Sequence, residues 1–342
     1  MRSLARSRDW RFTDLHFRGQ SVLRSAGPTA FAMNSSRDLL FWNLEIERVG
    51  GNAFGNTRSD GVFVVDCHMH DFGAYGLYSS RGARIGFLGN RLRCMHSFEH
   101  GYRTQGARKA YVAHNDLRDL GTVKDAFTIR GPYSSQIVLA HNRFEALSAF
   151  EPANDGGKTF IHHCLAEGNV STCGYWMMGQ HLTFRHNRMK YRRVQDRVIR
   201  PAEFARLSHK SSQVGVSEHL HFYHNTCYAP SFLVGRGNRV TTQHNIVVLA
   251  DSNIDRDGPG GPMRAVRPDE LDCDHNLYDA VNTDTGEAVQ ISEWLMQRRT
   301  TGNDLHSRIG DPKFLSLDPD DEDFLKPAPG GPGKGLGAQV FE

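Results

Sequence analysis

An apolar run that ends in His-Asn recurs along this chain and constrains its fold more than any other feature. The dipeptide occurs at His114-Asn115, His141-Asn142, His186-Asn187, His224-Asn225, His244-Asn245 and His275-Asn276. The same position is filled without the histidine at Asn43, Asp66, Asn90 and Asn169. Self-similarity at a nearly fixed period is typical of repeat architectures. We therefore expect a single elongated domain over residues 1–342 instead of two ordinary globular domains.

The spacing of the repeated position favours strands over helices. Successive positions from 43 to 276 are separated by 23, 24, 25, 27, 27, 18, 38, 20 and 31 residues. Each period holds two or three short segments in which apolar residues alternate with others, and glycine-containing turns separate these segments. A period of about two dozen residues made only of short strands indicates a parallel β-helix, in which each coil pairs with its neighbours.

A fixed asparagine has a physical role in such a fold. Side-chain amides that stack at the ~4.8 Å spacing of strands form a hydrogen-bonded ladder along the axis. Asparagine also tolerates the left-handed backbone that a sharp corner needs. The pattern over residues 10–280 resembles the right-handed parallel β-helix proteins of the pectate-lyase-like superfamily. This resemblance implies an all-β, right-handed parallel β-helix of about ten coils and no particular activity.

Three segments interrupt or follow the repeat. Residues 190–216 form a basic insert with seven lysines and arginines against Asp196 and Glu203. The insert therefore has a net charge of +5, whereas the whole chain has a net charge of +3. Its stretch 201–207 has the composition of a short helix. A Gly/Pro/Asp-rich loop is expected at 251–269 and a cap at 281–342, with a helix near 292–299. The total charge is too small to imply a partner.

Cysteine usage and hydropathy exclude several classes of protein. None of the six cysteines (Cys67, Cys94, Cys164, Cys173, Cys227 and Cys273) belongs to a CxxC pair, so a zinc cage is not expected. Buried free thiols are favoured, and one disulfide between Cys164 and Cys173 is left open. No apolar run approaches the about 20 residues of a membrane span. The basic first residues lack a following apolar stretch, so we find no signal peptide. A secreted or periplasmic protein without its leader is nevertheless expected.

The repeated histidines and asparagines are not candidates for a functional site, because such a site occurs once and a structural position occurs in every coil. Variation from coil to coil is instead found on the first strand of each period. Phe54, Leu77, Tyr102 and Phe127 are expected to point inward, and their neighbours outward. The outward face then carries these charged and polar side chains: Tyr78, Glu99, His100, Arg103, Gln105, Lys124, Asp125, Arg130, Glu151 and Lys158.

A charged groove with aromatic residues on parallel strands suits an extended acidic polysaccharide that contains uronate. In β-elimination a base removes the C5 proton while a cation neutralises the carboxylate. The candidate catalytic residues are Arg130, Arg103, His100 as base, Lys124, and Tyr78 as the acid to the leaving oxygen. The candidate substrate-binding residues are Gln105, Lys158, Trp176, Arg192, Arg193 and Arg197. Ca²⁺ is a possible cofactor, with Glu99, Asp125 and Glu151 as its ligands.

A short local match supports this chemistry. The segment 126–131, Ala-Phe-Thr-Ile-Arg-Gly, is similar to the strand that carries the catalytic arginine in the lyase family of alginate lyases and chondroitinase B. The resemblance implies that Arg130 is catalytic. It also implies a lysine near Gln105 in the preceding coil, which this chain lacks, so Arg103 would take its place.

Other functions remain open from the sequence. A glycoside hydrolase would use paired carboxylates from Glu99, Asp125, Glu151 and Asp155. A glycan-binding or adhesion β-helix would release no product, and an epimerase is a further possibility. Nucleic-acid binding is not expected, because the net charge is low and no recognition module is present. The oligomeric state is left open. Two histidine pairs have metal-like spacing: His68 and His70 share one strand face, whereas His162 and His163 point apart.

Overall fold

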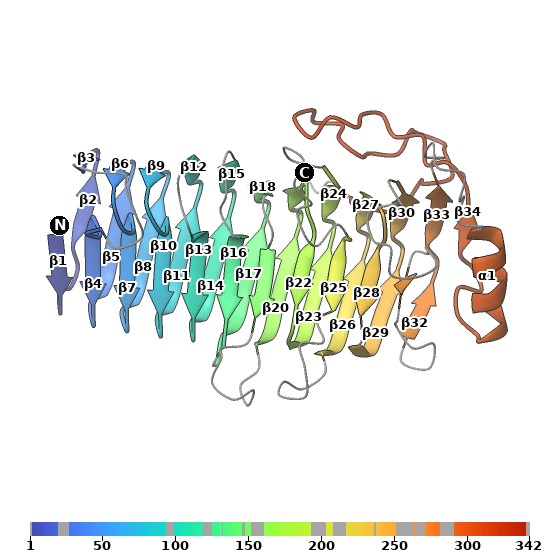
Figure 1. Ribbon diagram of the computed structural model, residues 1–342, viewed down its shortest axis with the longest axis horizontal. Coiled ribbons are helices and arrows are strands. Elements are labelled where there is room, and N and C mark those ends of the chain that lie inside the picture. Colours follow the sequence, from blue (N-terminus) through green and yellow to red (C-terminus); the bar gives the residue numbers. More distant parts are fainter. Residues whose placement is uncertain are drawn as a thin grey trace. The chain divides into compact units, whose positions relative to one another are not determined.

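The structure is a computed structural model that describes residues 2–19, 27–93, 99–118, 125–131, 133–145, 148–151, 161–192, 203–207, 217–235, 237–250, 263–264, 271–280 and 291–339. The chain divides into two compact units, Met1–Leu165 and Ala166–Glu342. Each unit is built from short parallel strands that follow one another around three sheets, which we call A, B and C (Figure 1). The expected single domain over 1–342 stays a prediction.

The first unit contributes strands to each sheet in chain order. Sheet A contains β1 (Arg2–Ala5), β4 (Phe31–Asn34), β7 (Phe54–Thr57), β10 (Leu77–Ser80), β13 (His100–Gln105), β16 (Asp125–Arg130) and β19 (Ser148–Glu151). Sheet B contains β2 (Arg11–Thr13), β5 (Arg37–Trp42), β8 (Asp60–Val65), β11 (Ala83–Leu88), β14 (Arg108–Ala113), β17 (Ser135–Ala140) and β20 (His162–Glu167). Sheet C contains β3 (His16–Arg18), β6 (Glu45–Val49), β9 (His68–Phe72), β12 (Arg91–Arg93), β15 (Asp116–Arg118) and β18 (Arg143–Phe144).

The second unit repeats this arrangement and adds a helix. Its sheet A strands are β22 (Tyr175–Met177), β25 (Ala205–Leu207), β28 (Leu233–Gly235) and β31 (Met263–Arg264). Sheet B contains β23 (Gln180–Arg185), β26 (Ser217–Tyr223), β29 (Gly237–Gln243) and β32 (Leu271–Asp274). Sheet C contains β21 (Val170–Ser171), β24 (Arg188–Lys190), β27 (Thr226–Ala229), β30 (Ile246–Leu249), β33 (Leu277–Ala280) and β34 (Arg308–Ile309). Helix α1 (Ile291–Thr300) lies between β33 and β34 in the chain.

The topology confirms the expected fold class. The pairings described between strands one coil apart are parallel, as where Leu77 of β10 pairs with Phe54 and with Tyr102. Connections between parallel strands of one sheet are right-handed in nearly all proteins. Each unit is a right-handed parallel β-helix. Side chains that point inward fill the cylinder, and the rings of Phe12, Phe41 and Phe54 stack or meet edge to face at 5.0–5.1 Å.

One expectation about the basic insert is wrong. The stretch 201–207 was expected to form a short helix inside an inserted loop, but Ala205–Leu207 is β25 and pairs with both β22 and β28. The stretch from Asn187 to Asn225, a spacing of 38 residues, therefore contains a regular coil. Its inward residues Ala205 and Leu207 are buried. Pairing with strands on both sides outweighs the helical composition of the segment.

The two residues of the His-Asn pair have opposite environments. Asn90, Asn115 and Asn142 are buried, and the amide of Asn90 donates to Asn115 Oδ1 at 3.0 Å while that of Asn115 donates to Asn142 Oδ1 at 2.9 Å. In the second unit, amides are joined in the same way at 2.9–3.1 Å along the series Asn169, Asn187, Asn225, Asn245 and Asn276. These amide groups satisfy one another inside a cylinder that excludes water.

The histidine, and not the asparagine, takes the left-handed backbone. The six repeated histidines have φ between 51° and 58°. Asn43 and Asp66 also have positive φ, and the sheet B register aligns the residues before them, Trp42 and Val65, with Ala113 before His114. These two residues therefore occupy the histidine position. Leu44 and Cys67 fill the buried position instead, so the sequence alignment was wrong by one residue in these coils.

The histidines stack in a column along the corner of the second unit. Ring centroids of His186, His224 and His244 are 4.9–5.2 Å apart. Partial burial, together with the charge of the next ring, lowers the pKa of all three imidazoles, and that of His186 to about 4. The usual value is 6.5. Below pH 6.5 the unfolded chain therefore binds protons that the folded chain does not, so the free energy of unfolding decreases as the pH falls.

We expect the melting temperature to fall between pH 7.5 and pH 5.0, a range that lies above the titration of ordinary carboxylates. His224→Asn should make this dependence weaker, because asparagine accepts the positive φ of 51° and carries no proton. Thermal melts followed by circular dichroism at several pH values provide the measurement. An equal pH dependence in wild type and variant would contradict this role of the column.

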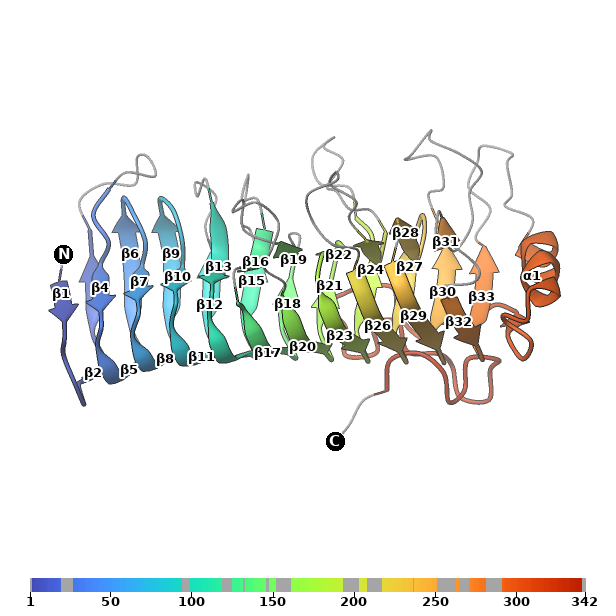
Figure 2. The same cartoon turned by 90° about the horizontal axis from the view of Figure 1, so that it is seen from below.

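Buried thiols occur in both units, and a C-terminal segment completes the second. Cys67, Cys164, Cys173, Cys227 and Cys273 are buried and not joined in disulfides, so the disulfide between Cys164 and Cys173 that the sequence left open is not formed. The expected helix is present as α1, and its Trp294 meets Tyr278 of β33 edge to face at 5.1 Å. The tail then runs back along sheet C (Figure 2), where Gly337 and Ala338 donate to His244 O and Thr226 Oγ1. No helix among the described residues is long and apolar enough to cross a membrane.

Candidate functional site on sheet A

Sheet A of the first unit carries the candidate site on three neighbouring strands. Leu77, Tyr102 and Phe127 of β10, β13 and β16 are paired in register and fully buried, which confirms their inward orientation. Alternation then places Tyr78, Arg103 and Thr128 side by side on the outer face. The same register sets Gln105 beside Arg130 and His100 beside Asp125. Parallel pairing therefore gathers residues from three coils, about 25 positions apart in sequence, on one face.

His100, Asp125 and Thr128 form a buried hydrogen-bonded group. His100 Nδ1 lies 2.8 Å from Asp125 Oδ2 and 2.9 Å from Thr128 Oγ1. The Thr128 hydroxyl donates to Asp125 Oδ2 at 2.7 Å. The three residues are 6%, 5% and 1% exposed. Such a group holds the imidazole in one orientation, because the carboxylate and the hydroxyl both bind the same ring nitrogen.

These contacts determine the tautomer of His100. The single hydroxyl proton of Thr128 is used in the bond to Asp125. Thr128 Oγ1 and the Asp125 carboxylate can therefore only accept from His100, so Nδ1 carries the proton. In the neutral ring Nε2 is then left with a lone pair. Nε2 lies 3.7 Å from Glu99 Oε2, and the Tyr75 ring stacks against the imidazole at 5.8 Å. This arrangement is that of a positioned base.

Two tyrosines surround the guanidinium group of Arg103. Arg103 Nη1 donates to the Tyr75 hydroxyl at 2.7 Å, and the group lies 5.6 and 5.8 Å from the ring centroids of Tyr75 and Tyr78. Burial raises the pKa of the Tyr75 phenol; Arg103 opposes this effect and Glu99 adds to it. The Tyr78 hydroxyl is directed at Gln105 Oε1 at 3.5 Å. Aromatic contacts thus hold the cation in place on the sheet surface.

Arginine donors are left without acceptors at this site. Arg103 Nε and Arg130 Nε are buried and have no hydrogen-bond partner among the described residues. The two arginines lie on neighbouring strands, two positions apart along the sheet. Unpaired buried donors are rare in folded proteins and call for an explanation such as a ligand or an ion. A carboxylate with several acceptor sites would satisfy both.

The other predicted residues fall into two groups. Lys124, Lys158, Arg193 and Arg197 lie outside the described residues, as does the side chain of Glu151. Trp176 on β22 and the exposed Arg192 belong to the second unit. Both remain predictions as substrate-binding residues.

The described residues do not provide a full set of calcium ligands at this site. Asp125 is committed to His100 and Thr128 through Oδ2, and Glu99 lies beside His100 Nε2. Ca²⁺ takes 6–8 oxygen ligands, whereas these two carboxylates serve the imidazole. Calcium stays a prediction, and no step proposed below depends on it.

Sequence reasoning missed Tyr75 and Thr128. Tyr75, His100 and Asp125 each stand two residues before the inward residue of their coil. The register that pointed to His100 and Asp125 therefore also points to Tyr75. The signal was available once the alignment of Leu77, Tyr102 and Phe127 was extended by one coil. Thr128 was recognised as outward-facing, but its hydrogen bonds to His100 and Asp125 depend on side-chain geometry that the sequence pattern does not contain.

Comparisons with known proteins give no family. No known protein family matches the sequence, and no curated protein matches it. Among solved structures, the chain is similar to that of the PL6 family alginate lyase AlyGC, with a TM-score of 0.45 and 12% identity over 83% of this chain and 49% of that chain. It is also similar to a tailspike protein mutant of E. coli bacteriophage HK620 in complex with a pentasaccharide, with a TM-score of 0.37 and 10% identity over 76% of this chain and 50% of that chain. The chain spans about half the length of each.

Proposed function

We propose that the protein is a secreted or periplasmic carbohydrate-active enzyme that cleaves a uronate-containing polysaccharide by β-elimination on sheet A of the first unit. The observation that carries this proposal is the placement of His100, with its Nε2 lone pair, on the strands that also hold Arg103 and Arg130. A base beside two arginines whose Nε atoms lack an acceptor among the described residues suits a substrate in which an acidic C–H lies next to a carboxylate.

The reaction assigns one role to each group. Arg103 and Arg130 bind the uronate carboxylate and stabilise the negative charge that develops on it as C5 loses its proton. His100 Nε2 accepts that proton, while Asp125 stabilises the imidazolium that forms. The C4–O4 bond breaks, a C4–C5 double bond forms, and the Tyr78 hydroxyl donates a proton to the leaving oxygen. His100 then releases the accepted proton to solvent, and the Tyr78 phenolate takes up a proton from solvent.

The geometry favours elimination over hydrolysis. A hydrolase would need a pair of carboxylates that face the substrate. Asp125 instead points its Oδ2 at His100 and Thr128 and is 5% exposed. Because Asp125 is bound in this way, it orients the base and is a poor nucleophile or general acid.

Uronate polymers should give the unsaturated, ultraviolet-absorbing product of elimination when incubated with the protein. Arg103→Gln and Arg130→Gln should each lower kcat/KM by about 10²–10³-fold, because each removes a cation from the developing charge. Arg108→Gln is the matched control, since Arg108 is an exposed arginine on sheet B of the same unit.

Three outcomes of this screen are informative. Unsaturated products that depend on Arg103 and Arg130 support elimination, with or without a chelator, and the chelator separately tests the calcium prediction. New reducing ends without ultraviolet absorbance would replace the lyase by a hydrolase. Binding of a polymer without any product would make the same face a glycan-binding surface.

A further inference from the structure

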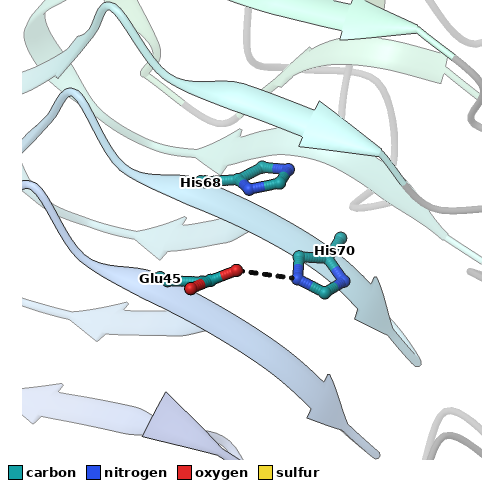
Figure 3. Close-up of side chains that lie close together, drawn as sticks. All are labelled: Glu45, His68 and His70. Carbon is teal, nitrogen blue, oxygen red and sulfur yellow. Dashed lines mark ion pairs between the residues drawn. The ribbon is translucent and has the colours of Figure 1, made fainter. Parts of the chain in front are cut away.

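A second group of functional side chains lies on sheet C of the first unit, away from sheet A. His68 and His70 are two positions apart on β9, so alternation puts both rings on the same face. Glu45 on the neighbouring strand β6 is paired in register with His68. Figure 3 shows the three side chains together on these two strands. Neither the corner column nor the proposed elimination uses them.

One possible ligand atom from each of the three residues lies close to those of the other two. The nearest nitrogen or oxygen atoms of Glu45, His68 and His70 all lie within 4.8 Å of one another. His70 Nε2 is 3.5 Å from Glu45 Oε1, and the two imidazole centroids are 4.8 Å apart. A tetrahedral ion with metal–ligand distances of about 2.0–2.1 Å separates its ligand atoms by roughly 3.4 Å. Small side-chain rotations therefore place all three atoms on one ion.

A fourth residue, Asp71, orients the ring of His70. His70 Nδ1 lies 3.1 Å from Asp71 Oδ2. A carboxylate at this nitrogen holds the proton on Nδ1 and leaves the lone pair on Nε2, which is the nitrogen that faces Glu45. Metal-binding histidines in proteins usually have this kind of partner on the other ring nitrogen. The contact with Asp71 is thus an independent indication that His70 is oriented as a ligand.

His68 is partly buried beside its neighbours on sheet C. Its ring centroid lies 4.8 Å from that of His70, and Arg91 of β12 is paired in register with it. Arg93, which is paired in register with His70, forms an ion pair with Asp116 at 2.6 Å. Glu45 is about half exposed, which leaves one side of the group open to solvent.

We propose that Glu45, His68 and His70 bind a divalent first-row transition metal ion such as Zn²⁺, with Asp71 as the orienting partner of His70 and water at the remaining position. Two imidazoles and one carboxylate form a borderline-soft ligand set, which suits Zn²⁺ and its neighbours better than Ca²⁺ or Mg²⁺. The site is independent of the elimination proposed on sheet A.

Co²⁺ and Zn²⁺ titrations of the full chain test this site directly. Co²⁺ reports four-coordinate binding by its visible absorption, and Zn²⁺ should displace it with a stoichiometry of one. His68→Gln and His70→Gln should each abolish the visible band. Asp71→Asn should keep the band and weaken binding by about 10–100-fold, as expected for a partner outside the coordination sphere.

The second histidine-rich group of the described residues provides the control. Asp274, His275 and His306 also bring three possible ligand atoms within 4.8 Å, in the second unit. The double variant His275→Gln/His306→Gln should retain the Co²⁺ band. Binding that is lost in this variant but kept in His68→Gln and His70→Gln would overturn the proposal, as would the absence of stoichiometric binding in the wild type. Circular dichroism and the melting temperature in the absence of metal verify that each variant is folded.

Discussion

Replacing Asp125 by asparagine is expected to lower kcat on a uronate polymer by about 10³-fold, within the range that a positioned base contributes, and to leave KM close to the wild-type value. In the wild type, Thr128 donates to Asp125 Oδ2, and His100 Nδ1 donates to both. An amide at position 125 presents an NH₂ group either to Thr128 or to the imidazole. When the amide donates to Nδ1, the ring proton moves to Nε2 and the lone pair that accepts the C5 proton is lost.

Initial rates of unsaturated-product formation over a range of substrate concentrations provide the measurement. His100→Gln removes the base itself and should be at least as severe as Asp125→Asn. Thr128→Val removes only the hydroxyl, and Asp125 still orients Nδ1, so its effect should be smaller, at roughly 10-fold. A kcat for Asp125→Asn within threefold of the wild type would show that the imidazole of His100 is not the base. A KM effect alone would point to substrate binding instead of proton transfer.

The fold follows from the sequence because one physical requirement recurs in the coils from Asn90 to Asn276. A polar residue inside the cylinder must find hydrogen-bond partners, and Asn115 finds one in the equivalent residue one coil away. This requirement repeats at nearly constant spacing and is visible without coordinates. The position of single residues within the repeat is less secure. Asn43 and Asp66 were assigned to the buried position by residue type, and only the strand register shows that Leu44 and Cys67 occupy it.

The candidate site was partly predictable for the same reason. Alternation along β13 and β16 correctly places Arg103 and Arg130 outward, on the same strands that hold His100 and Asp125. The contact of Asp125 with His100 was not predicted, and Asp125 was assigned to calcium. Acidic residues are typical calcium ligands, and the sequence does not show that a threonine three residues later binds the same carboxylate oxygen.

The largest expected effect on stability is that of Asn115→Ala, because this change breaks the amide series inside the cylinder. The Asn115 amide donates to Phe87 O at 2.8 Å and to Asn142 Oδ1 at 2.9 Å. Its Oδ1 accepts from the backbone N–H and the side-chain amide of Asn90 at 2.9 and 3.0 Å. Truncation leaves these buried groups without partners, and each unsatisfied group costs about 1–3 kcal/mol. We expect the free energy of unfolding to fall by about 3–5 kcal/mol, since partial relaxation recovers some of these bonds.

His114→Asn is the matched control, one residue earlier in the same repeat. His114 is exposed and has a φ of 56°, a conformation that asparagine accepts. The variant loses the ring stack with His141, at a centroid distance of 5.1 Å, and should cost less than about 1 kcal/mol. Denaturant titrations followed by circular dichroism compare the two variants with the wild type. Equal losses would mean that the corner as a whole stabilises the coil. A large loss for Asn115→Ala alone assigns the stability to the buried amide, and thereby explains why the asparagine persists at Asn90 and Asn169, where a glycine replaces the histidine.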